Sequence, residues 1–547
     1  MSKYTIGIDF GKTGCRALLL DISNGSEIAS ASAEYYNGIM LNNFFNGVPL
    51  PEKWAIADPQ DYIDVINESV SIVSAKVPAE DIVGIGLAFS SCCILPVKAD
   101  GTPLSALPEF KNNPHAYIKV TRHRSAEKQA NKIYDTAKAF KEPWLDIGQN
   151  GNSPEWLLPK VLEILEESPA IYEAADYFIE ATDWLIWQLT GNPVRNAFSA
   201  SFKAQVSEDI IPSKEFLKAL HPALENLYQT KLNLPIASTV TRAGGLTRAM
   251  AAPMGIKAGT PVAVGGVDIL CCLPALNVCK PGILTGILGT SSIFVTLSQK
   301  SVEPMGIARG VKGSIIPGYY TYKSNLPCVG DNYAWFLNNY LTPEYHNGAK
   351  AEGRNLHSFI AQKMMKLKPG ENGIISLNWL KGTVCPINDK NLSGLFIGMD
   401  LNTKPEHIYR AIIEGMAFDT RMLIEEYAVN NIDIESFYGI GTIAERNPFI
   451  TQLYADILNM PVYVAGSSKS PALGAGIIAA TISGHYPDIQ SAAAAMGQLK
   501  NVVYMPDVSA SAVYDSMYVE YKKLRDYFAV ENTSIMHNLK AIKRENS

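Results

Sequence analysis

The chain has 547 residues, of which 47% are hydrophobic and 18% charged, with 47 Lys and Arg against 53 Asp and Glu. This length is too great for one ordinary hydrophobic core and predicts two large domains. The net charge of −6 excludes the basic excess with which proteins neutralise nucleic-acid phosphates. The chain starts without a signal-type segment and contains no run of about 18 apolar residues, so we expect a cytoplasmic protein with no membrane or nucleic-acid partner.

The cysteines and histidines do not suggest a metal cage. The chain has eight cysteines, and four of them form the adjacent pairs Cys92-Cys93 and Cys271-Cys272. Zinc ligands usually come as C-x2-C pairs instead. The eight histidines show no H-x3-H spacing. We therefore expect buried reduced thiols, and any metal ion should arrive with a nucleotide.

The first half of the chain alternates strand and helix patterns. Residues 4–9 and 17–22 are apolar runs joined by a small-residue turn, which predicts a hairpin. Residues 81–89 predict a buried strand, whereas 154–169 and 178–191 carry helical apolar spacing. Strands alternating with helices predict an α/β fold.

The second half repeats this organisation. The segment PVAVGGVD (261–268) is a strand that ends on glycines and an aspartate, and we place a domain boundary after it, giving domains 1–275 and 276–547. A second hairpin is predicted over 282–297. Beyond it, the pattern predicts helices over 405–430, 444–458 and 471–481 and a strand over 436–441.

Three glycine-rich turns are candidates for phosphate binding. They are the two hairpin tips, at 11–14 and 289–292, and the turn at 439–441. Backbone N–H groups in such turns can converge on phosphate oxygens, although either tip alone is more simply read as a hairpin turn. Because the chain has neither a Walker A motif nor G-x-G-x-x-G, the three together favour a nucleotide site split between two domains.

Two aspartates are candidates for the chemistry. Asp9 closes the first strand, where a carboxylate could hold Mg2+ through water, or could simply cap the turn. Asp268 follows Gly265-Gly266 and precedes apolar residues, a position from which it could accept a proton from a hydroxyl. The alternative for Asp268 is a buried structural aspartate.

The chain resembles the FGGY family of carbohydrate kinases through an ordered set of motifs. Each motif is short, but their order over most of the chain is specific. They are GIDFG (7–11), WAIADPQDY (54–62), FKNNPHAYIKV (110–120), PEWLLPKVL (154–162), ATDWLIWQLTG (181–191), FKAQ (202–205), RAGGLT (242–247), GGVD (265–268), LGTSS (288–292), IIPGYY (315–320), VGDNYAWF (329–336), AERNP (444–448) and ALGAG (472–476).

The resemblance implies a fold and an activity. It implies two actin-like, ribonuclease-H-like domains with an interdomain cleft, the sugar held mainly by 1–275 and ATP mainly by 276–547. It also implies Mg2+-dependent phosphorylation of a small sugar or polyol, with a ketopentose such as L-ribulose as the first candidate. A homodimer would be ordinary for this family.

The resemblance assigns roles to individual residues. Asp268 matches the base that takes the proton from the sugar hydroxyl, and Asp9 matches the aspartate near Mg2+ and the phosphates. The expected sugar site is completed by Ser91, Cys92, Lys203 and Lys323. The expected nucleotide site comprises Lys12, Thr13, Gly289, Thr290, Ser291, Gly441, Thr442 and Asn447.

Several of these positions differ from the family pattern. In the first loop, residues 11–16, the acid and the serine of related kinases are absent and Lys12 has appeared. Ala88 stands where related ketopentose kinases carry an acid, and Lys323 stands where they carry a glutamate. Thr442 takes the place of a second glycine. These exchanges leave two alternatives open, a kinase for an acidic sugar and a binding or regulatory protein that has lost turnover. An actin-like ATPase or chaperone is a third, less favoured alternative.

Overall fold

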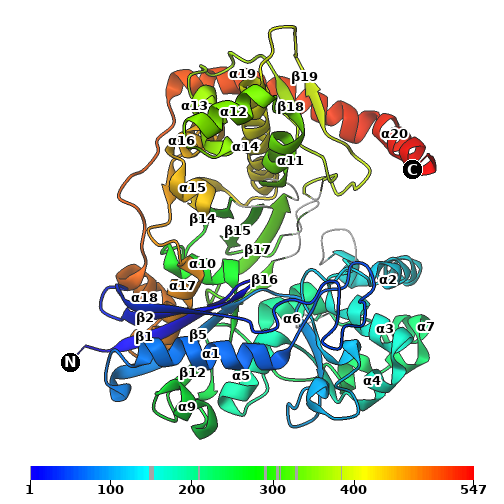
Figure 1. The fold of residues 1–547 in the computed structure, drawn as a ribbon, viewed down its shortest axis with the longest axis vertical. Coiled ribbons are helices and arrows are strands. Elements are labelled where there is room, and N and C mark those ends of the chain that lie inside the picture. The colour runs from blue at the N-terminus through cyan, green and yellow to red at the C-terminus, as the bar shows by residue number, and fades with distance from the viewer. Residues whose placement is uncertain are drawn as a thin grey trace. The chain divides into compact units, whose positions relative to one another are not determined.

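The structure is a computed structural model that describes residues 2–546, apart from 147–152, 207–209, 289–291, 303–306, 308–309, 327–329 and 384. The chain divides into two compact units (Figure 1). The first comprises 1–279, 309–321 and 469–498, and the second comprises 280–308, 322–468 and 499–547. Each unit is made of several segments of the chain, whereas the sequence predicted one boundary after residue 275. That boundary stays a prediction.

The first unit is built on a mixed sheet. Its strand order is β11-β12-β5-β1-β2-β3, with β13 beside β5. β1 pairs antiparallel with β2, as the predicted hairpin requires, and parallel with β5, whereas β13 also pairs parallel with β5. The strands are β1 (Tyr4–Phe10), β2 (Gly14–Asp21), β3 (Glu27–Glu34), β5 (Ile82–Phe89), β11 (Arg242–Gly245), β12 (Pro261–Ala263) and β13 (Gly266–Val267).

Helix α17 (Ser470–Ile482) packs on this sheet through small residues, and α1 (Pro59–Ser74) covers strands β2 and β3 (Figure 1). A Cβ on Gly7 would lie 1.8 Å from the Ala472 carbonyl oxygen, and one on Gly86 would lie 2.0 Å from that of Ala475. Glycine therefore allows the backbones of strand and helix to touch. The predicted helix at 471–481 is confirmed, and it packs against strands more than 380 residues earlier in the chain.

A second, four-stranded sheet in this unit corrects the start of one predicted helix. Its order is β4-β7-β6-β8, formed by Ile56–Ala57, Ile118–Lys119, Ile94–Val97 and Tyr177–Glu180. Residues 178–180 were predicted as helix but pair antiparallel with 94–96, so helix α5 (Ala181–Thr190) begins only after the strand. The predicted helix 154–169 is confirmed over α3 (Leu157–Glu167), because Pro169 starts a separate helix, α4 (Pro169–Ala174).

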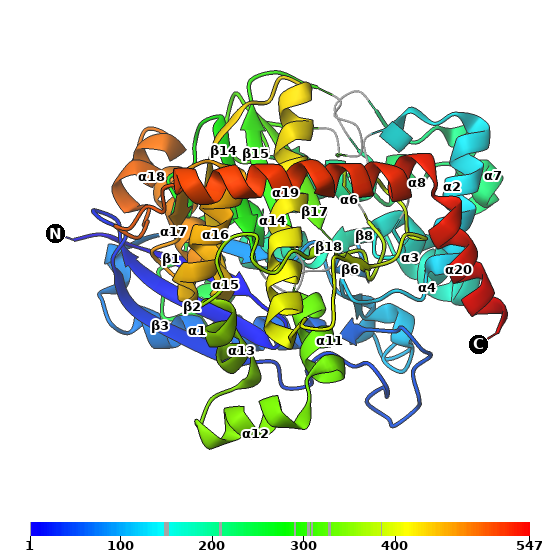
Figure 2. The same ribbon diagram turned by 90° about the horizontal axis from the view of Figure 1, so that it is seen from above.

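A further sheet has the strand order β16-β17-β15-β14-β20-β21. Its strands are Val311–Lys312, Tyr320–Leu326, Ser292–Ser298, Gly282–Ile287, Ile434–Ile440 and Val462–Val464. α19 (Val508–Asp526) crosses α14 (Pro405–Val429) in Figure 2. Their contact buries an Arg410–Glu414 ion pair of 2.8 Å, to which the Tyr514 hydroxyl hydrogen-bonds.

The predicted helix 444–458 is interrupted in the structure. α15 (Thr442–Arg446) ends before Asn447, and α16 (Pro448–Leu458) begins after it, because the Asn447 side chain accepts the Ile450 N–H at 3.1 Å and Pro448 occupies the first helical position. This interruption lies inside one of the predicted nucleotide-site segments.

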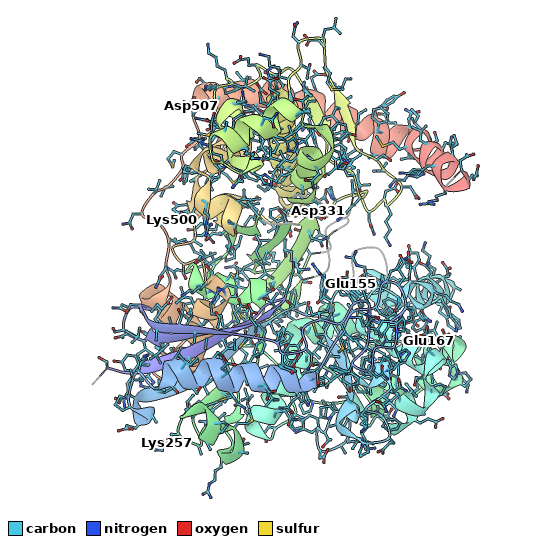
Figure 3. All side chains as sticks on the ribbon, in the orientation of Figure 1. Glu155, Glu167, Lys257, Asp331, Lys500 and Asp507 are labelled. Atoms are coloured by element: carbon cyan, nitrogen blue, oxygen red, sulfur yellow. The ribbon has the colours of Figure 1, made fainter. Side chains whose placement is uncertain are left out.

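The thiol prediction is confirmed for the described residues. Seven cysteines are free and buried there. Exposed side chains of both signs, such as Glu167, Lys257, Lys500 and Asp507, are labelled in Figure 3. Within the described ranges, no helix has the length and apolar character needed to span a bilayer.

Candidate active site

Three parallel strands of the first unit end side by side, close to the predicted metal residue Asp9, the predicted base Asp268 and the predicted sugar residues Ser91 and Cys92. Asp9 of β1 is in register with Ala88 of β5, and Gly266 of β13 is in register with the same Ala88 from the other side. Asp268 follows β13, and residues 90–93 follow β5. The carboxyl ends of parallel strands are where α/β sheets bind ligands, so Asp9, Asp268 and the 90–93 turn share one edge.

Asp268 is the first residue of α10 (Asp268–Ala275), not the last residue of a strand as predicted. Its Oδ1 accepts the Ile269 N–H at 2.7 Å. A carboxylate in the first turn of a helix is stabilised by the helix dipole. Asp268 stands at the amino end of α10, directly after β13.

The surroundings of Asp9 disfavour the negatively charged form of its carboxyl group. Burial, and then the negative charge of Asp268, raise the pKa of Asp9 to about 7, and Arg16 opposes the rise. Two neighbouring carboxylates with hard oxygen donors suit a divalent cation. The described residues contain no cluster of three or more His, Cys, Asp or Glu side chains able to hold a metal ion, so the donor set fits Mg2+ that brings further oxygen ligands with it.

Helix α6 (Ala197–Ala204), which carries Lys203, is tied to the strand that precedes Asp268. Asn196 accepts the Phe198 and Ser199 N–H groups through its side-chain oxygen. Its amide nitrogen donates to the Thr239 hydroxyl and to the Gly265 carbonyl, each at 2.8 Å. The sequence prediction did not include Asn196, although an asparagine directly before a helical segment is a recognisable capping signal.

Lys203 is nearly buried and holds its charge over aromatic rings. It is 9% exposed, and its Nζ lies 4.6 Å from the ring centre of Phe202 and 5.6 Å from that of Trp156. No carboxylate of a described residue forms an ion pair with it. An ammonium group in this setting gains from a polar or anionic ligand.

The turn after β5 is held by residues that sequence reasoning missed. The Thr121 hydroxyl donates to the Ser91 carbonyl at 2.7 Å, and the buried Glu180 and Lys160 bind the backbone of Cys92. The sequence signal that could have identified Lys160 and Glu180 is a charged residue within an apolar segment. Ser91 and Cys92 follow β5 shortly after Phe89, which is in register with Val267, the residue before Asp268.

The remaining predicted residues fall into three groups. Lys12 and Thr13 are exposed at the hairpin tip, where Tyr35 donates its side-chain hydroxyl to the Gly11 carbonyl and its backbone N–H to that of Thr13. Gly289, Thr290 and Ser291 lie outside the described residues. The others belong to the second unit.

In the second unit, β14 and β20 run parallel and end together, with Gly286 opposite Gly439. Gly441 follows with φ of 94°, a conformation that strongly favours glycine, and Thr442 then begins α15. The Asn447 side-chain oxygen is engaged in capping α16. Lys323 lies in β17 and is partly exposed.

Solved structures share the architecture of this chain. The chain superposes on a gluconate kinase from Lactobacillus acidophilus with a TM-score of 0.79 and 18% identity, covering 98% of this chain and 100% of that one. A xylulose kinase from Rhodospirillum rubrum gives 0.79 and 19%, with the same coverage. The fold is therefore the two-domain, actin-like fold of sugar kinases, as predicted.

The family follows from sequence relatives. The N- and C-terminal domain models of the FGGY family of carbohydrate kinases match residues 4–273 and 284–482. A ribulokinase from Bacillus licheniformis is 39% identical over 536 residues, covering 96% of this chain and 97% of the relative. One from Halalkalibacterium halodurans is 38% identical over 550 residues, covering 99% and 98%. The chain belongs to the FGGY family of carbohydrate kinases, and its enzyme class is that of a sugar kinase.

Proposed function

We propose that the chain transfers the γ-phosphoryl group of ATP to a hydroxyl of a ketopentose, with L-ribulose as the first candidate. The observation that carries this proposal is the shared sheet edge in the first unit, where Asp268 adjoins Asp9 and the 90–93 turn. The near full-length similarity to proteins named ribulokinase supports the choice of sugar.

In this proposal Asp268 accepts the proton of the sugar hydroxyl while the hydroxyl oxygen forms a bond to the γ-phosphorus and the bond to the β-phosphate oxygen breaks. Lys203 donates a hydrogen bond to a sugar oxygen and orients the hydroxyl. Asp9 holds Mg2+, directly or through water, and Mg2+ when bound neutralises charge on the β- and γ-phosphates. The rate then depends mainly on positioning and electrostatics.

The nucleotide side of the proposal rests on Lys12, Thr13, Gly441, Thr442 and Asn447, together with residues 289–291. We infer that 1–275 binds mainly the sugar and 276–547 mainly ATP, as the resemblance to the FGGY family implies. Ser91, Cys92 and Lys323 complete the proposed sugar site. A cytoplasmic homodimer remains the expected form.

The second candidate is a kinase for an acidic sugar. It is favoured by the nearly buried ammonium of Lys203, with which no described carboxylate forms an ion pair, and by Lys323 at a position where related kinases carry an acid. An anionic sugar would supply the missing negative charge. Phosphorylation of neutral pentuloses alone would reject this candidate.

A coupled ADP-release assay over pentuloses, pentitols and sugar acids, each with ATP and Mg2+, tests the proposal. We expect the highest kcat/KM for L-ribulose or a close ketopentose. If no sugar raises ADP release above the background rate, the kinase proposal fails. Calorimetry with ATP and Mg2+ then tests the regulatory alternative, which requires a protein that binds a ligand without turnover.

A further inference from the structure

The turn after β5 contains an unusual backbone conformation. Cys92 has φ of 69°, in the left-handed region. The other described non-glycine residues with positive φ are asparagine, lysine or glutamine, and they number six. The left-handed region is unfavourable for an L-residue with a Cβ, so the Cys92 backbone is strained. Such strain persists only where the surroundings impose it, and it concentrates at functional sites.

Two buried charged side chains impose it. Both carboxylate oxygens of Glu180 accept backbone N–H groups, from Cys92 at 3.1 Å and from Cys93 at 2.9 Å. The Lys160 ammonium donates to the Cys92 carbonyl at 2.6 Å. The two peptide groups that flank the strained Cys92 Cα are thereby held from opposite directions.

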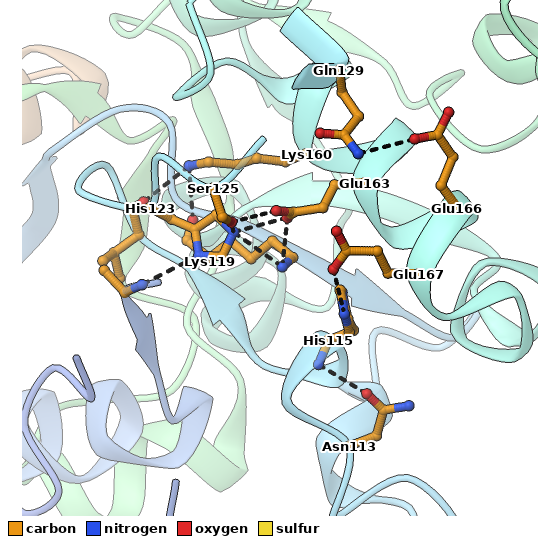
Figure 4. Close-up of polar contacts among 12 residues, drawn as sticks. Asn113, His115, Lys119, His123, Ser125, Gln129, Lys160, Glu163, Glu166 and Glu167 are labelled. Atoms are coloured by element: carbon orange, nitrogen blue, oxygen red, sulfur yellow. Dashed lines mark hydrogen bonds and ion pairs between the residues drawn. The ribbon is translucent and has the colours of Figure 1, made fainter. Parts of the chain in front are cut away.

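The same lysine links this turn to its neighbour. Its ammonium also donates to the Lys119 and Val120 carbonyls, at 3.1 Å and 2.9 Å. Figure 4 shows Lys160 beside the buried cluster in which Glu163 binds Lys119 and His123, each at 2.8 Å. Lys160 therefore fixes the Cys92 turn against a rigid, fully paired part of the unit.

Placing these charges in the interior is costly. Glu180 is 4% exposed and Lys160 is 0% exposed. Burial raises the pKa of Glu180 to about 7 and lowers that of Lys160. Neutral or apolar side chains would fill the same volume at lower cost. Two buried charges directed at one short turn therefore indicate that the geometry of the turn matters.

The turn lies where the proposed sugar would bind. It follows β5, whose last residues are in register with Gly266 and Val267, just before Asp268. The positive charge of Lys203 is near enough to lower the pKa values of both the Cys92 thiol and the Glu180 carboxyl against their larger burial effects. The turn therefore lies close to Asp268, the proposed base, and to Lys203, which we propose binds the sugar.

We propose that Glu180 and Lys160 are positioning residues for the sugar. They hold the Ser91-Cys92-Cys93 turn in a single conformation, so that its backbone forms one wall of the sugar pocket beside Lys203 and Asp268. This proposal rests on the proposed function, because it assigns the turn to the sugar side of the same site.

The variants Glu180→Gln and Lys160→Met test it. Glu180→Gln replaces one of the two accepting oxygens by an amide nitrogen that cannot accept, and Lys160→Met removes the ammonium donor. We expect the sugar KM to rise about 10- to 100-fold, as for a lost hydrogen bond to a charged group, with the ATP KM within about twofold. A released turn should also expose the Cys92 thiol, which is 1% exposed in the structure. Its alkylation by iodoacetamide, followed by peptide mass spectrometry, should become about tenfold faster.

A rescue experiment separates positioning from general stability. Adding Cys92→Gly to Glu180→Gln supplies a residue that adopts positive φ without strain, so the sugar KM should fall several-fold relative to Glu180→Gln alone. Glu414→Gln, which removes a buried ion-paired carboxylate in the second unit, is the matched control. It should lower the Tm and leave the sugar KM unchanged.

The proposal is overturned if both clamp variants keep the wild-type sugar KM, or if they change kcat and both KM values only in step with a lowered Tm, as a structural role would. An unchanged rate of Cys92 alkylation in both variants also overturns it. If the wild-type protein phosphorylates no sugar, the proposed function fails separately, and the alkylation rates alone decide whether the clamp exists.

Discussion

Replacing Gly474 by alanine tests how firmly the fold positions the proposed base. Gly474 lies in α17, and a Cβ there would lie 1.6 Å from the Cys271 carbonyl oxygen of α10. Cβ atoms essentially never approach other atoms closer than 3.0 Å, so the two helices must separate by about 1.4 Å at this contact. The obstacle is backbone, which cannot rotate away, and such overpacking typically costs about 1–3 kcal/mol.

The displacement should reach the chemistry because Asp268 lies three residues before Cys271 on the same helix. A misplacement of about 1 Å can lower a catalytic rate about 100-fold. We therefore expect Gly474→Ala to lower the Tm and to reduce kcat for the sugar by about 10- to 100-fold. Thermal unfolding and coupled ADP release measure the two effects on the same preparation.

Thr481→Ala on the same helix is the control. It removes a hydroxyl that hydrogen-bonds the Ile477 carbonyl at 3.1 Å, and it should change both quantities little. If Gly474→Ala keeps the wild-type Tm and kcat, the close packing of α17 on α10 does not hold Asp268, and the reasoning is wrong.

Three further predictions concern single side chains. Lys203→Met should raise the sugar KM about 10- to 100-fold in steady-state kinetics, since it removes a charged hydrogen-bond donor; an unchanged KM would exclude sugar contact. Asp9→Asn should raise the Mg2+ concentration for half-maximal rate about tenfold, whereas an unaltered Mg2+ dependence would contradict its role. Burial, followed by the negative charge of Glu180, raises the pKa of Asp183 to about 8. The folded protein therefore holds this proton more tightly than the unfolded chain does. The free energy of unfolding should fall by up to about 1.4 kcal/mol per pH unit as pH rises from about 4 to 8. Asp183→Asn should remove that part of the fall in urea unfolding; an identical pH profile would refute the assignment.

Much of the fold could be predicted because it depends on local patterns. The first hairpin, the strand at 81–89 and the helix at 405–430 all follow from apolar periodicity and turn residues. The errors occurred where tertiary contacts decide. Residues 178–180 have helical spacing, but pairing with 94–96 makes them a strand, and the Asn447 cap divides one predicted helix into two.

The candidate site shows the same limit. Asp9 and Asp268 could be selected because each follows an apolar run close to glycines. The register of Asp9 and of Gly266 with Ala88 brings the ends of their strands to one edge. Glu180, Lys160 and Asn196 could not, because their partners are backbone groups from distant segments that sequence spacing does not reveal. The packing of α17 in the first unit was hidden for the same reason.

Sugar-dependent ADP release by Asp268→Asn tests the central claim most directly. Asparagine keeps an oxygen to accept the Ile269 N–H but cannot take the proton of the hydroxyl. We predict that the sugar-dependent rate falls by about 100- to 10,000-fold while the Tm and the affinity for ATP measured by calorimetry stay near the wild-type values. A variant that phosphorylates the sugar within about threefold of the wild-type rate would contradict the assignment of Asp268 as the base.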